Sequence, residues 1–185
     1  MDTSDDELKK IMAKKIKDDR YVKNLDKRRQ IIKDLVNTSQ LNNITPIWHT
    51  TARRIDFNKQ KHQLPDKYLE DGFTILKNVD IEILINSTTP GNIEMYGERL
   101  LYHPDLQDWK IDDILHYWYN NTKLIPPTIT LLDETLEYYD VDRNELYISD
   151  GTHRINVANF YGAKTIPIIV SNKQLERIKD FLNIF

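Results

Sequence analysis

The alternation of apolar and polar positions predicts a run of short strands and helices in the C-terminal part of the chain. The stretch from Tyr147 to Val170 reads as an apolar strand, a polar turn, a helix and a second apolar strand. The helix ends at Gly162, a residue type that often follows a helix C-cap, and residues 166–170 are typical of a buried strand. We expect the inward face of the helix to carry Ile155, Val157, Ala158 and Tyr161.

Further elements of the same kind are predicted upstream and downstream of this stretch. Residues 73–85 contain two short apolar runs, which indicates a hairpin or a strand entering a sheet. Residues 109–121 have the spacing of an amphipathic helix, and residues 128–132 read as a strand after two prolines. Residues 140–144 are typical of a hairpin turn, and residues 172–183 of a closing helix.

The N-terminal part of the chain has a different pattern. Residues 4–38 carry two apolar stripes at helical spacing, and a polar break at residues 18–21 indicates two helices that form a hairpin or pack on the body. Residues 37–69 are polar, contain prolines and lack periodicity, so we expect them to wrap the surface. The expected division is therefore a helical extension with its wrapping segment over residues 1–69, and an α/β domain over residues 70–185.

Composition excludes several classes of chemistry. The 185-residue chain is long enough for a sizeable core, and it contains no cysteine. A disulfide framework, a thiol nucleophile and a thiolate metal site are therefore excluded, and the chain suits a reducing compartment. No stretch has the apolar core of a signal peptide or the length of a membrane span, so we expect a cytoplasmic protein with no membrane partner.

Charge is distributed unevenly along the chain. Residues 9–33 hold 11 Lys and Arg against 3 Asp, whereas residues 34–185 hold 15 basic and 22 acidic residues. A basic segment of this kind marks either a nucleic-acid contact or a solvated helix face. The acidic body opposes strong nonspecific binding to DNA.

Isolated histidines in the wrapping segment do not predict a metal site. His49 and His62 lie among scattered aromatic and basic residues that can line a site, but no HExxH or HxH spacing occurs. Single histidines of this kind are more often structural or exposed than metal ligands.

The turn at residues 150–154, with the sequence DGTHR, is the candidate site for chemistry. It falls between the predicted strand and the predicted helix. A helix N-terminus presents N–H groups and a partial positive charge, so an anion such as phosphate can bind there, with Gly151 allowing close approach. Arg154 is the expected bidentate clamp for that anion. The alternative is that these polar residues only cap the helix.

The order of these motifs suggests a family. IPPTI at residues 125–129, YISDGTHR at residues 147–154, Gly162 and Ile166-Pro167 together resemble the ParB/sulfiredoxin-like superfamily over about residues 109–170. The resemblance implies a small mixed sheet with packed helices, an α/β (α+β) fold.

Details of the turn separate the branches of that superfamily. Sulfiredoxins have a cysteine directly before the His-Arg pair, where this chain has Thr152, so sulfinic-acid reductase chemistry is not expected. Chromosome-partition proteins that bind CTP have Gly-Glu-Arg-Arg at the turn and continue into a helix-turn-helix domain. This chain has Gly-Thr-His-Arg and only 15 residues after Val170, so a full partition protein is not expected either.

The Asp-Gly-x-His-Arg form looks closer to the branch that includes free-serine kinases. That resemblance implies a nucleoside triphosphate or diphosphate with Mg²⁺, and a small hydroxyl-bearing acceptor. It implies Glu98 as the base, with Asp150 as the residue that positions a metal ion or the acceptor and His153 as a further catalytic residue. The phosphate-binding residues that it implies are Gly151, Thr152, His153 and Arg154.

Two other functions stay open. A ParB-like nucleic-acid-binding or nuclease module can use the basic residues 9–33 to hold backbone phosphate. A regulatory protein can keep the fold after losing the ligand. Steep salt dependence is expected for nucleic-acid binding, whereas binding of a mononucleotide is expected to depend on Mg²⁺ and Arg154.

Overall fold

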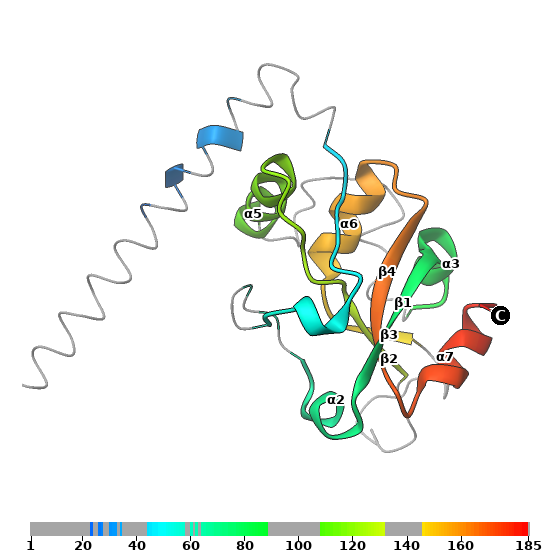
Figure 1. Ribbon diagram of the computed structural model, residues 1–185. Helices are drawn as coiled ribbons and strands as arrows, with labels where there is room; N and C mark the ends of the chain where they lie inside the picture. The colour runs from blue at the N-terminus through cyan, green and yellow to red at the C-terminus, as the bar shows by residue number, and fades with distance from the viewer. Residues whose placement is uncertain are drawn as a thin grey trace, which may run out of the picture. The chain divides into compact units, whose positions relative to one another are not determined.

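Figure 1 shows the computed structural model of the protein. The structure describes residues 44–57, 60, 62, 64–88, 108–131 and 146–184, and residues 23, 26, 27, 30–32 and 34 near the N-terminus. By its contacts the chain divides into two compact units, Met1–Asn43 and Ile44–Phe185. The described residues of the first unit are helical, as predicted, whereas the break predicted at residues 18–21 lies outside the described residues.

The second unit contains a four-stranded mixed sheet (Figure 1). Its strand order is β1-β4-β2-β3, in which β4 is antiparallel to β1 and parallel to β2, and β3 is antiparallel to β2. This arrangement confirms the mixed α/β class and the small mixed sheet. The strands are β1 (Phe73–Asp80), β2 (Thr128–Leu131), β3 (Leu146–Asp150) and β4 (Thr165–Ser171).

Helices cover the sheet. In the view of Figure 1, α5 and α6 lie to the left of β4, and α7 lies to its right. α5 packs against α6, and α7 packs against β4. Among the described residues, no helix is long and apolar enough to cross a membrane. The helices are η2 (Ala52–Arg54), α2 (Asp66–Asp71), α3 (Ile81–Asn86), α5 (Asp108–Tyr119), α6 (Thr152–Phe160) and α7 (Leu175–Phe181).

The core forms around the central strands. β4 is buried at every position after Thr165, and its sequence TIPIIVS is a nearly continuous apolar run because both of its faces are covered. Tyr68, Ile125 and Ile169 form a fully buried cluster. Since Tyr68 comes from α2 and Trp48 forms a bridge with Leu124, the segment 44–69 packs on the body of the second unit.

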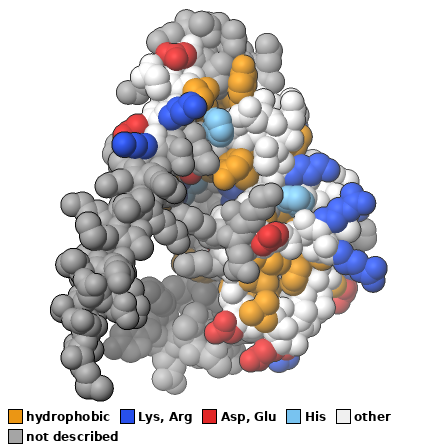
Figure 2. Space-filling view, turned by 60° about the vertical axis from the view of Figure 1, so that its left-hand side comes forward, with side chains coloured by type: hydrophobic (Ala, Val, Ile, Leu, Met, Phe, Trp, Pro, Cys, Tyr) orange, Lys and Arg blue, Asp and Glu red, His pale blue; other side chains and the backbone are white. Residues whose placement is uncertain are grey.

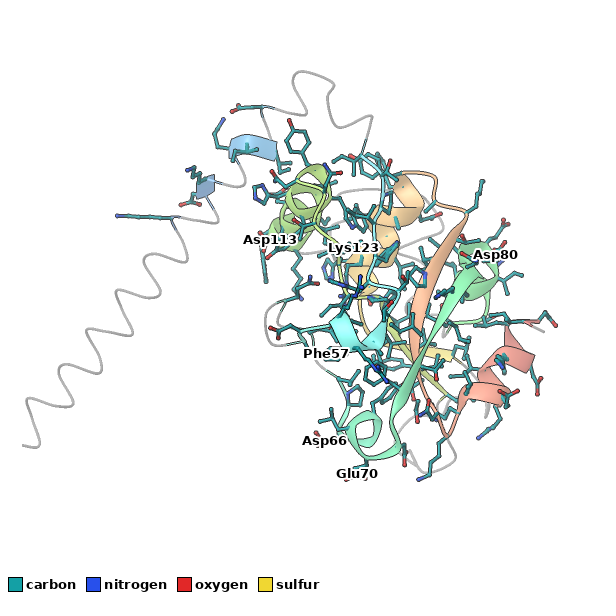
Figure 3. All side chains as sticks on the ribbon, in the orientation of Figure 1. Phe57, Asp66, Glu70, Asp80, Asp113 and Lys123 are labelled. Carbon is teal, nitrogen blue, oxygen red and sulfur yellow. The ribbon has the colours of Figure 1, made fainter. Side chains whose placement is uncertain are left out.

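The junction after β1 corrects one sequence prediction. The first apolar run of residues 73–85 is a strand, as predicted, but the second is helix α3, so the hairpin alternative is wrong. The reason is Asp80, which ends the strand (Figure 3) and whose Oδ1 accepts hydrogen bonds from the N–H groups of Glu82 at 2.9 Å and Ile83 at 3.0 Å. A side-chain cap of this kind starts a helix even in a short apolar segment.

The remaining elements follow the sequence closely. The helix expected at residues 109–121 is α5, and the closing helix expected at residues 172–183 is α7, which is shorter at both ends. β2 and β3 pair antiparallel, and the hairpin turn predicted at residues 140–144 lies outside the described residues.

Candidate functional site

The junction between β3 and α6 is built around one glycine. Gly151 is the N-cap residue of α6 and has φ of 106°. A Cβ atom at this position would lie 2.6 Å from Cβ of Pro127 and 2.7 Å from its Cα, which is too close for any side chain. The carbonyl oxygen of Gly151 accepts the N–H of Ile155 at 3.0 Å and begins the helix. Glycine is therefore required here both by backbone conformation and by space.

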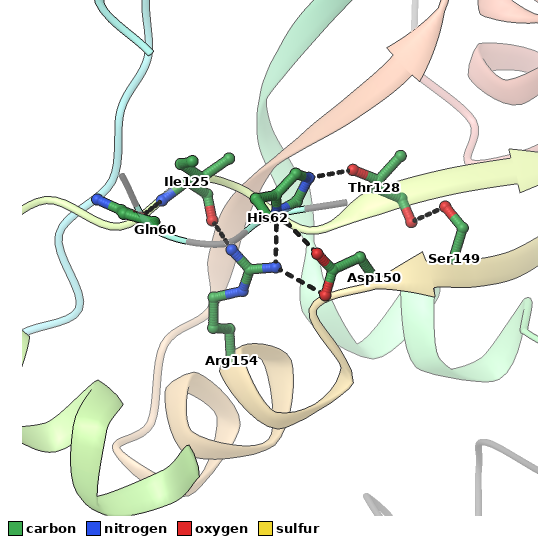
Figure 4. Close-up of polar contacts among 7 residues, drawn as sticks. All are labelled: Gln60, His62, Ile125, Thr128, Ser149, Asp150 and Arg154. Carbon is green, nitrogen blue, oxygen red and sulfur yellow. Dashed lines mark hydrogen bonds and ion pairs between the residues drawn. The ribbon is translucent and has the colours of Figure 1, made fainter. Parts of the chain in front are cut away.

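Arg154 extends from the first turn of α6 back toward the sheet (Figure 4). Its Nη1 donates to the carbonyl oxygen of Ile125 at 2.7 Å, and its Nη2 lies 3.2 Å from Oδ1 of Asp150. The side chain is 11% exposed. Burial lowers the pKa of Arg154, and the charge and hydrogen bond of Asp150 oppose that shift. The guanidinium remains charged, so the junction contains a nearly buried cation.

His62 is the third member of this cluster, and it comes from a distant part of the chain. Its side chain is fully buried, with Nδ1 3.0 Å from Oδ2 of Asp150 and 3.0 Å from Nη2 of Arg154. Its Nε2 lies 2.8 Å from Oγ1 of Thr128. A carboxylate oxygen can only accept and a guanidinium nitrogen can only donate, so Nδ1 can hydrogen-bond to one of the two groups. A proton on Nδ1 gives Oδ2 of Asp150 a donor and leaves Oδ1 for Arg154. We therefore assign Nδ1–H as a donor to Asp150.

The order hydroxyl, imidazole, carboxylate in Thr128, His62 and Asp150 is that of a catalytic triad. A nucleophile must be reachable by its substrate, however, and Thr128 is completely buried. Its backbone oxygen also accepts the hydroxyl of Ser149 at 3.1 Å, which joins β2 to β3 at the same level. Thr128 is therefore a structural partner of His62.

Gln60 ties the segment that carries His62 to the start of β2 (Figure 4). Its Nε2 donates to the carbonyl oxygen of Lys123 at 2.8 Å, and its Oε1 accepts the N–H of Ile125 at 2.9 Å. Because Arg154 binds the carbonyl oxygen of Ile125, both polar groups of that residue are engaged by the site. The cluster thus joins three segments: the loop around residue 60, the entry to β2, and the β3–α6 junction.

His153 lies beside the cluster in the first turn of α6. Burial, the charge of Lys110 on α5 and the charge of Arg154 lower the pKa of His153 to about 4, against a smaller opposing effect of Asp150. The imidazole is therefore neutral near pH 7. Two cationic side chains from two packed helices act on it, so the start of α6 is a region of positive potential.

Basic side chains also gather on one part of the surface. On the face in Figure 2, Lys and Arg side chains gather at the right-hand side beside a histidine, and Asp and Glu side chains lie mainly toward the lower edge. Lys110 itself lies over the ring of Trp109, with Nζ 5.5 Å from the ring centroid. The negative net charge of the chain therefore does not describe every part of its surface.

The structure brings together most of the residues that sequence analysis placed in the site. Asp150, Gly151 and Arg154 are in contact, and Thr152 and His153 occupy the first turn of α6. Glu98 lies outside the described residues. Within the part of the chain that the structure describes, no group of three His, Cys, Asp or Glu side chains can hold a metal ion.

Sequence reasoning missed the contribution of His62. In the sequence His62 is one of several scattered polar and aromatic residues, and the segment around it has no periodicity that would place its side chain. Its contact with Arg154 spans 92 positions of the chain. The only local signal is a histidine in an otherwise polar loop, which does not identify a partner.

Comparison with known proteins identified no matching family model, no matching curated protein and no matching solved structure.

Proposed function

We propose that the protein binds a phosphate-bearing ligand, a nucleotide, at the β3–α6 junction. The observation that carries this proposal is the convergence of two cationic side chains on the start of α6, where Lys110 and Arg154 add to the effect of burial in lowering the pKa of His153 to about 4. An anion bound there would relieve the repulsion among these groups. In the absence of an anion, the helix dipole adds to that repulsion.

The backbone supports the same conclusion. The N-cap residue of the nine-residue helix α6 is a glycine, which has no side chain to cover the first turn. Phosphate groups commonly bind at helix N-termini that follow a glycine. Because the guanidinium of Arg154 is already bonded to Ile125 and Asp150, we assign it the role of a fixed positive charge behind the anion. This role differs from the direct bidentate clamp expected from sequence.

In the proposed complex, Mg²⁺ is coordinated by the phosphate oxygens of the nucleotide. Both oxygens of Asp150 face donors, Oδ1 facing Arg154 and Oδ2 facing His62, so this carboxylate is not a preformed metal ligand. Mg²⁺ keeps several water or phosphate ligands and needs few from a protein. We therefore derive no step through a metal ion held by the chain itself.

The ParB/sulfiredoxin-like resemblance extends the proposal from binding to phosphotransfer. In that reading Glu98 is the base that accepts the proton of an acceptor hydroxyl, and the junction positions the phosphate. Replacing Glu98 by Gln is expected to abolish turnover of ATP while leaving its affinity unchanged. Unchanged turnover in that variant would remove Glu98 from the mechanism.

The first test of binding is a calorimetric titration of the full chain with ATP, ADP and CTP, each with and without Mg²⁺. It is combined with NMR titration of the His153 imidazole, because an anion at the start of α6 must raise the pKa of His153 above about 4. Lys110→Met is expected to weaken nucleotide binding. The matched control is Lys77→Met, since Lys77 is an exposed lysine in β1, at the opposite edge of the sheet from β3.

Two results would contradict nucleotide binding at this junction. One is the absence of saturable binding for any of the three nucleotides. The other is binding that leaves the pKa of His153 unchanged and is weakened equally by Lys110→Met and Lys77→Met. Arg154→Ala is less informative, because it removes the partners of Ile125 and Asp150 and thereby destabilises the fold.

A second candidate function follows from the charge of residues 9–33, which hold 11 Lys and Arg against 3 Asp. Such a segment favours a contact with nucleic-acid backbone. Its affinity is expected to fall steeply with salt, in proportion to the number of phosphates neutralised. Nucleotide binding at the β3–α6 junction depends on far fewer charges, so the slope of affinity against salt separates the two functions.

A further inference from the structure

We infer that His62 is a positioning residue of the β3–α6 site, acting through the Asp150–Arg154 pair. The inference is argued from the contacts of His62. Its consequence for phosphate affinity rests on the proposed function. His62 lies outside the sequence motif, yet its imidazole touches the carboxylate, the guanidinium and strand β2 at once. A bound nucleotide would meet charges whose geometry His62 has fixed beforehand.

The first step of the argument is the direction of the hydrogen bonds. With its proton on Nδ1, His62 donates to Oδ2 of Asp150 at 3.0 Å, which leaves Oδ1 for Nη2 of Arg154 at 3.2 Å. Each carboxylate oxygen therefore faces a donor. The approach of Nη2 to Nδ1 at 3.0 Å is then a consequence of both groups binding the same carboxylate.

The second step is that the imidazole itself cannot move freely. Its Nε2 is 2.8 Å from the hydroxyl of Thr128 in the centre of the sheet, and its ring packs against Phe57, with 5.5 Å between centroids. Gln60 holds the same segment to Lys123 and Ile125 through two hydrogen bonds. A group fixed on both sides in this way transmits its orientation to whatever it binds.

The third step concerns the site. Arg154 donates from Nη1 to Ile125 and from Nη2 to Asp150, so the plane of its guanidinium is set by these two acceptors. If the carboxylate of Asp150 rotates, the guanidinium loses one of its two acceptors. Because the charge of Arg154 acts on the start of α6, its position affects any anion bound there. His62 thus contributes to phosphate affinity without touching phosphate.

The test compares His62→Asn with His62→Gln, measured with inorganic phosphate and with ATP and Mg²⁺. The amide nitrogen of asparagine can replace Nδ1 and keep the hydrogen bond to Asp150, whereas that of glutamine replaces Nε2 and loses it. We expect phosphate affinity near the wild-type value in His62→Asn and about tenfold weaker in His62→Gln, because only the Gln variant loses the hydrogen bond to the charged carboxylate.

A second readout needs no ligand. Hindered rotation of the Arg154 guanidinium, seen as separate ¹⁵N signals for its two amino groups, is expected in the wild-type protein and in His62→Asn. The signals are expected to merge in His62→Gln. The signals are assigned to Arg154 because they are absent from the spectrum of the Arg154→Lys variant. Equal behaviour of the Asn and Gln variants in both readouts would overturn the inference and leave His62 a packing residue.

The wild-type protein also provides a check without any substitution. The ¹⁵N shifts of the His62 ring report which nitrogen carries the proton, and a neutral ring protonated only on Nε2 would overturn the inference. Failure of the proposed function gives a different result. Separate Arg154 signals that merge only in His62→Gln, together with no binding of phosphate or ATP, would reject nucleotide binding while supporting the positioning role.

Discussion

The strands β1 and β3 both end in aspartate and lead into a helix, and the two aspartates have different roles. Asp80 ends β1 and turns its carboxylate onto the N–H groups of its own helix, α3. Asp150 ends β3, but its carboxylate binds Arg154 and His62. Between Asp150 and its helix lies Gly151, which has no counterpart after Asp80.

The comparison teaches how one residue can convert a capping position into a site. Without an insertion, the strand-ending carboxylate is already at the N-cap, the position where a side chain best binds the first-turn N–H groups. With a glycine at φ of 106° inserted, the glycine becomes the N-cap and the aspartate moves one position out. The carboxylate then lies at the end of the edge strand β3, where it binds Arg154 and His62.

The largest expected effect comes from Gly151→Ala. The substitution adds a side chain at positive φ and within 2.7 Å of Pro127, so we expect a loss of about 4 kcal/mol in the free energy of unfolding. Gly162→Ala is the control, because Gly162 also has positive φ but nothing lies within 4 Å of its added Cβ. It is expected to cost about 1 kcal/mol. Urea denaturation measures both, and equal losses would contradict the steric role of Pro127.

The next effect separates the two aspartates directly. Asp150→Asn removes the charge that binds Arg154 and an acceptor for His62, so we expect a loss of about 2 kcal/mol. Asp80→Asn is expected to be nearly neutral, because asparagine caps helices as well as aspartate does. Thermal denaturation of the two variants at one pH gives the comparison. A neutral Asp150→Asn would show that the ion pair does not contribute to stability.

A smaller effect is expected when the cap of α3 is removed altogether. Asp80→Ala deletes the acceptor of two hydrogen bonds, and we expect a loss of about 1 kcal/mol. Hydrogen exchange of the amides of Glu82 and Ile83 localises the loss to the first turn of α3. Unchanged exchange at these two amides would show that the cap does not hold that turn.

The smallest change in stability is expected from His153, whose ring remains partly hydrated. Its pKa of about 4 in the folded protein lies below the ordinary value of 6.5, so the unfolded chain takes up a proton first. Its contribution to stability is complete above pH 6.5 and is lost as the pH falls toward 4. His153→Gln is expected to reduce the slope of melting temperature against pH in this window. An unchanged slope would indicate that the pKa of His153 is not depressed.

Much of the fold is visible in local sequence patterns. The run from β3 through α6 to β4 was predicted from its apolar spacing and Gly162, and α5 from its amphipathic pattern. The start of α3 was missed, because a two-part apolar run reads as a hairpin unless the aspartate between its halves is recognised as a cap. The capping side chain of Asp80 is sufficient to predict the start of α3, whereas the spacing of the apolar residues is not.

The candidate site was only half visible for a different reason. Asp150, Gly151 and Arg154 lie within five consecutive residues, so the sequence displays them together. Arg154 nevertheless reads as a bidentate clamp for an anion, since nothing local shows that Ile125 and Asp150 accept its hydrogen bonds. The placement of His62 beside Thr128 of β2 is a tertiary contact that no local spacing encodes.

The strand order has a consequence for how the chain reaches its folded state. β4 follows the other strands in sequence, yet it is the inner neighbour of β1, so that Thr74 and Asn172, 98 positions apart, bond to each other. Pairings of such separation close a long loop before they gain contacts, which makes folding slow. During synthesis, β1 leaves the ribosome long before β4, the strand with which it pairs, exists. A chain arrested before Thr165 therefore contains the edge strands β1 and β3 but lacks β4, the strand that connects β1 to β2 and β3.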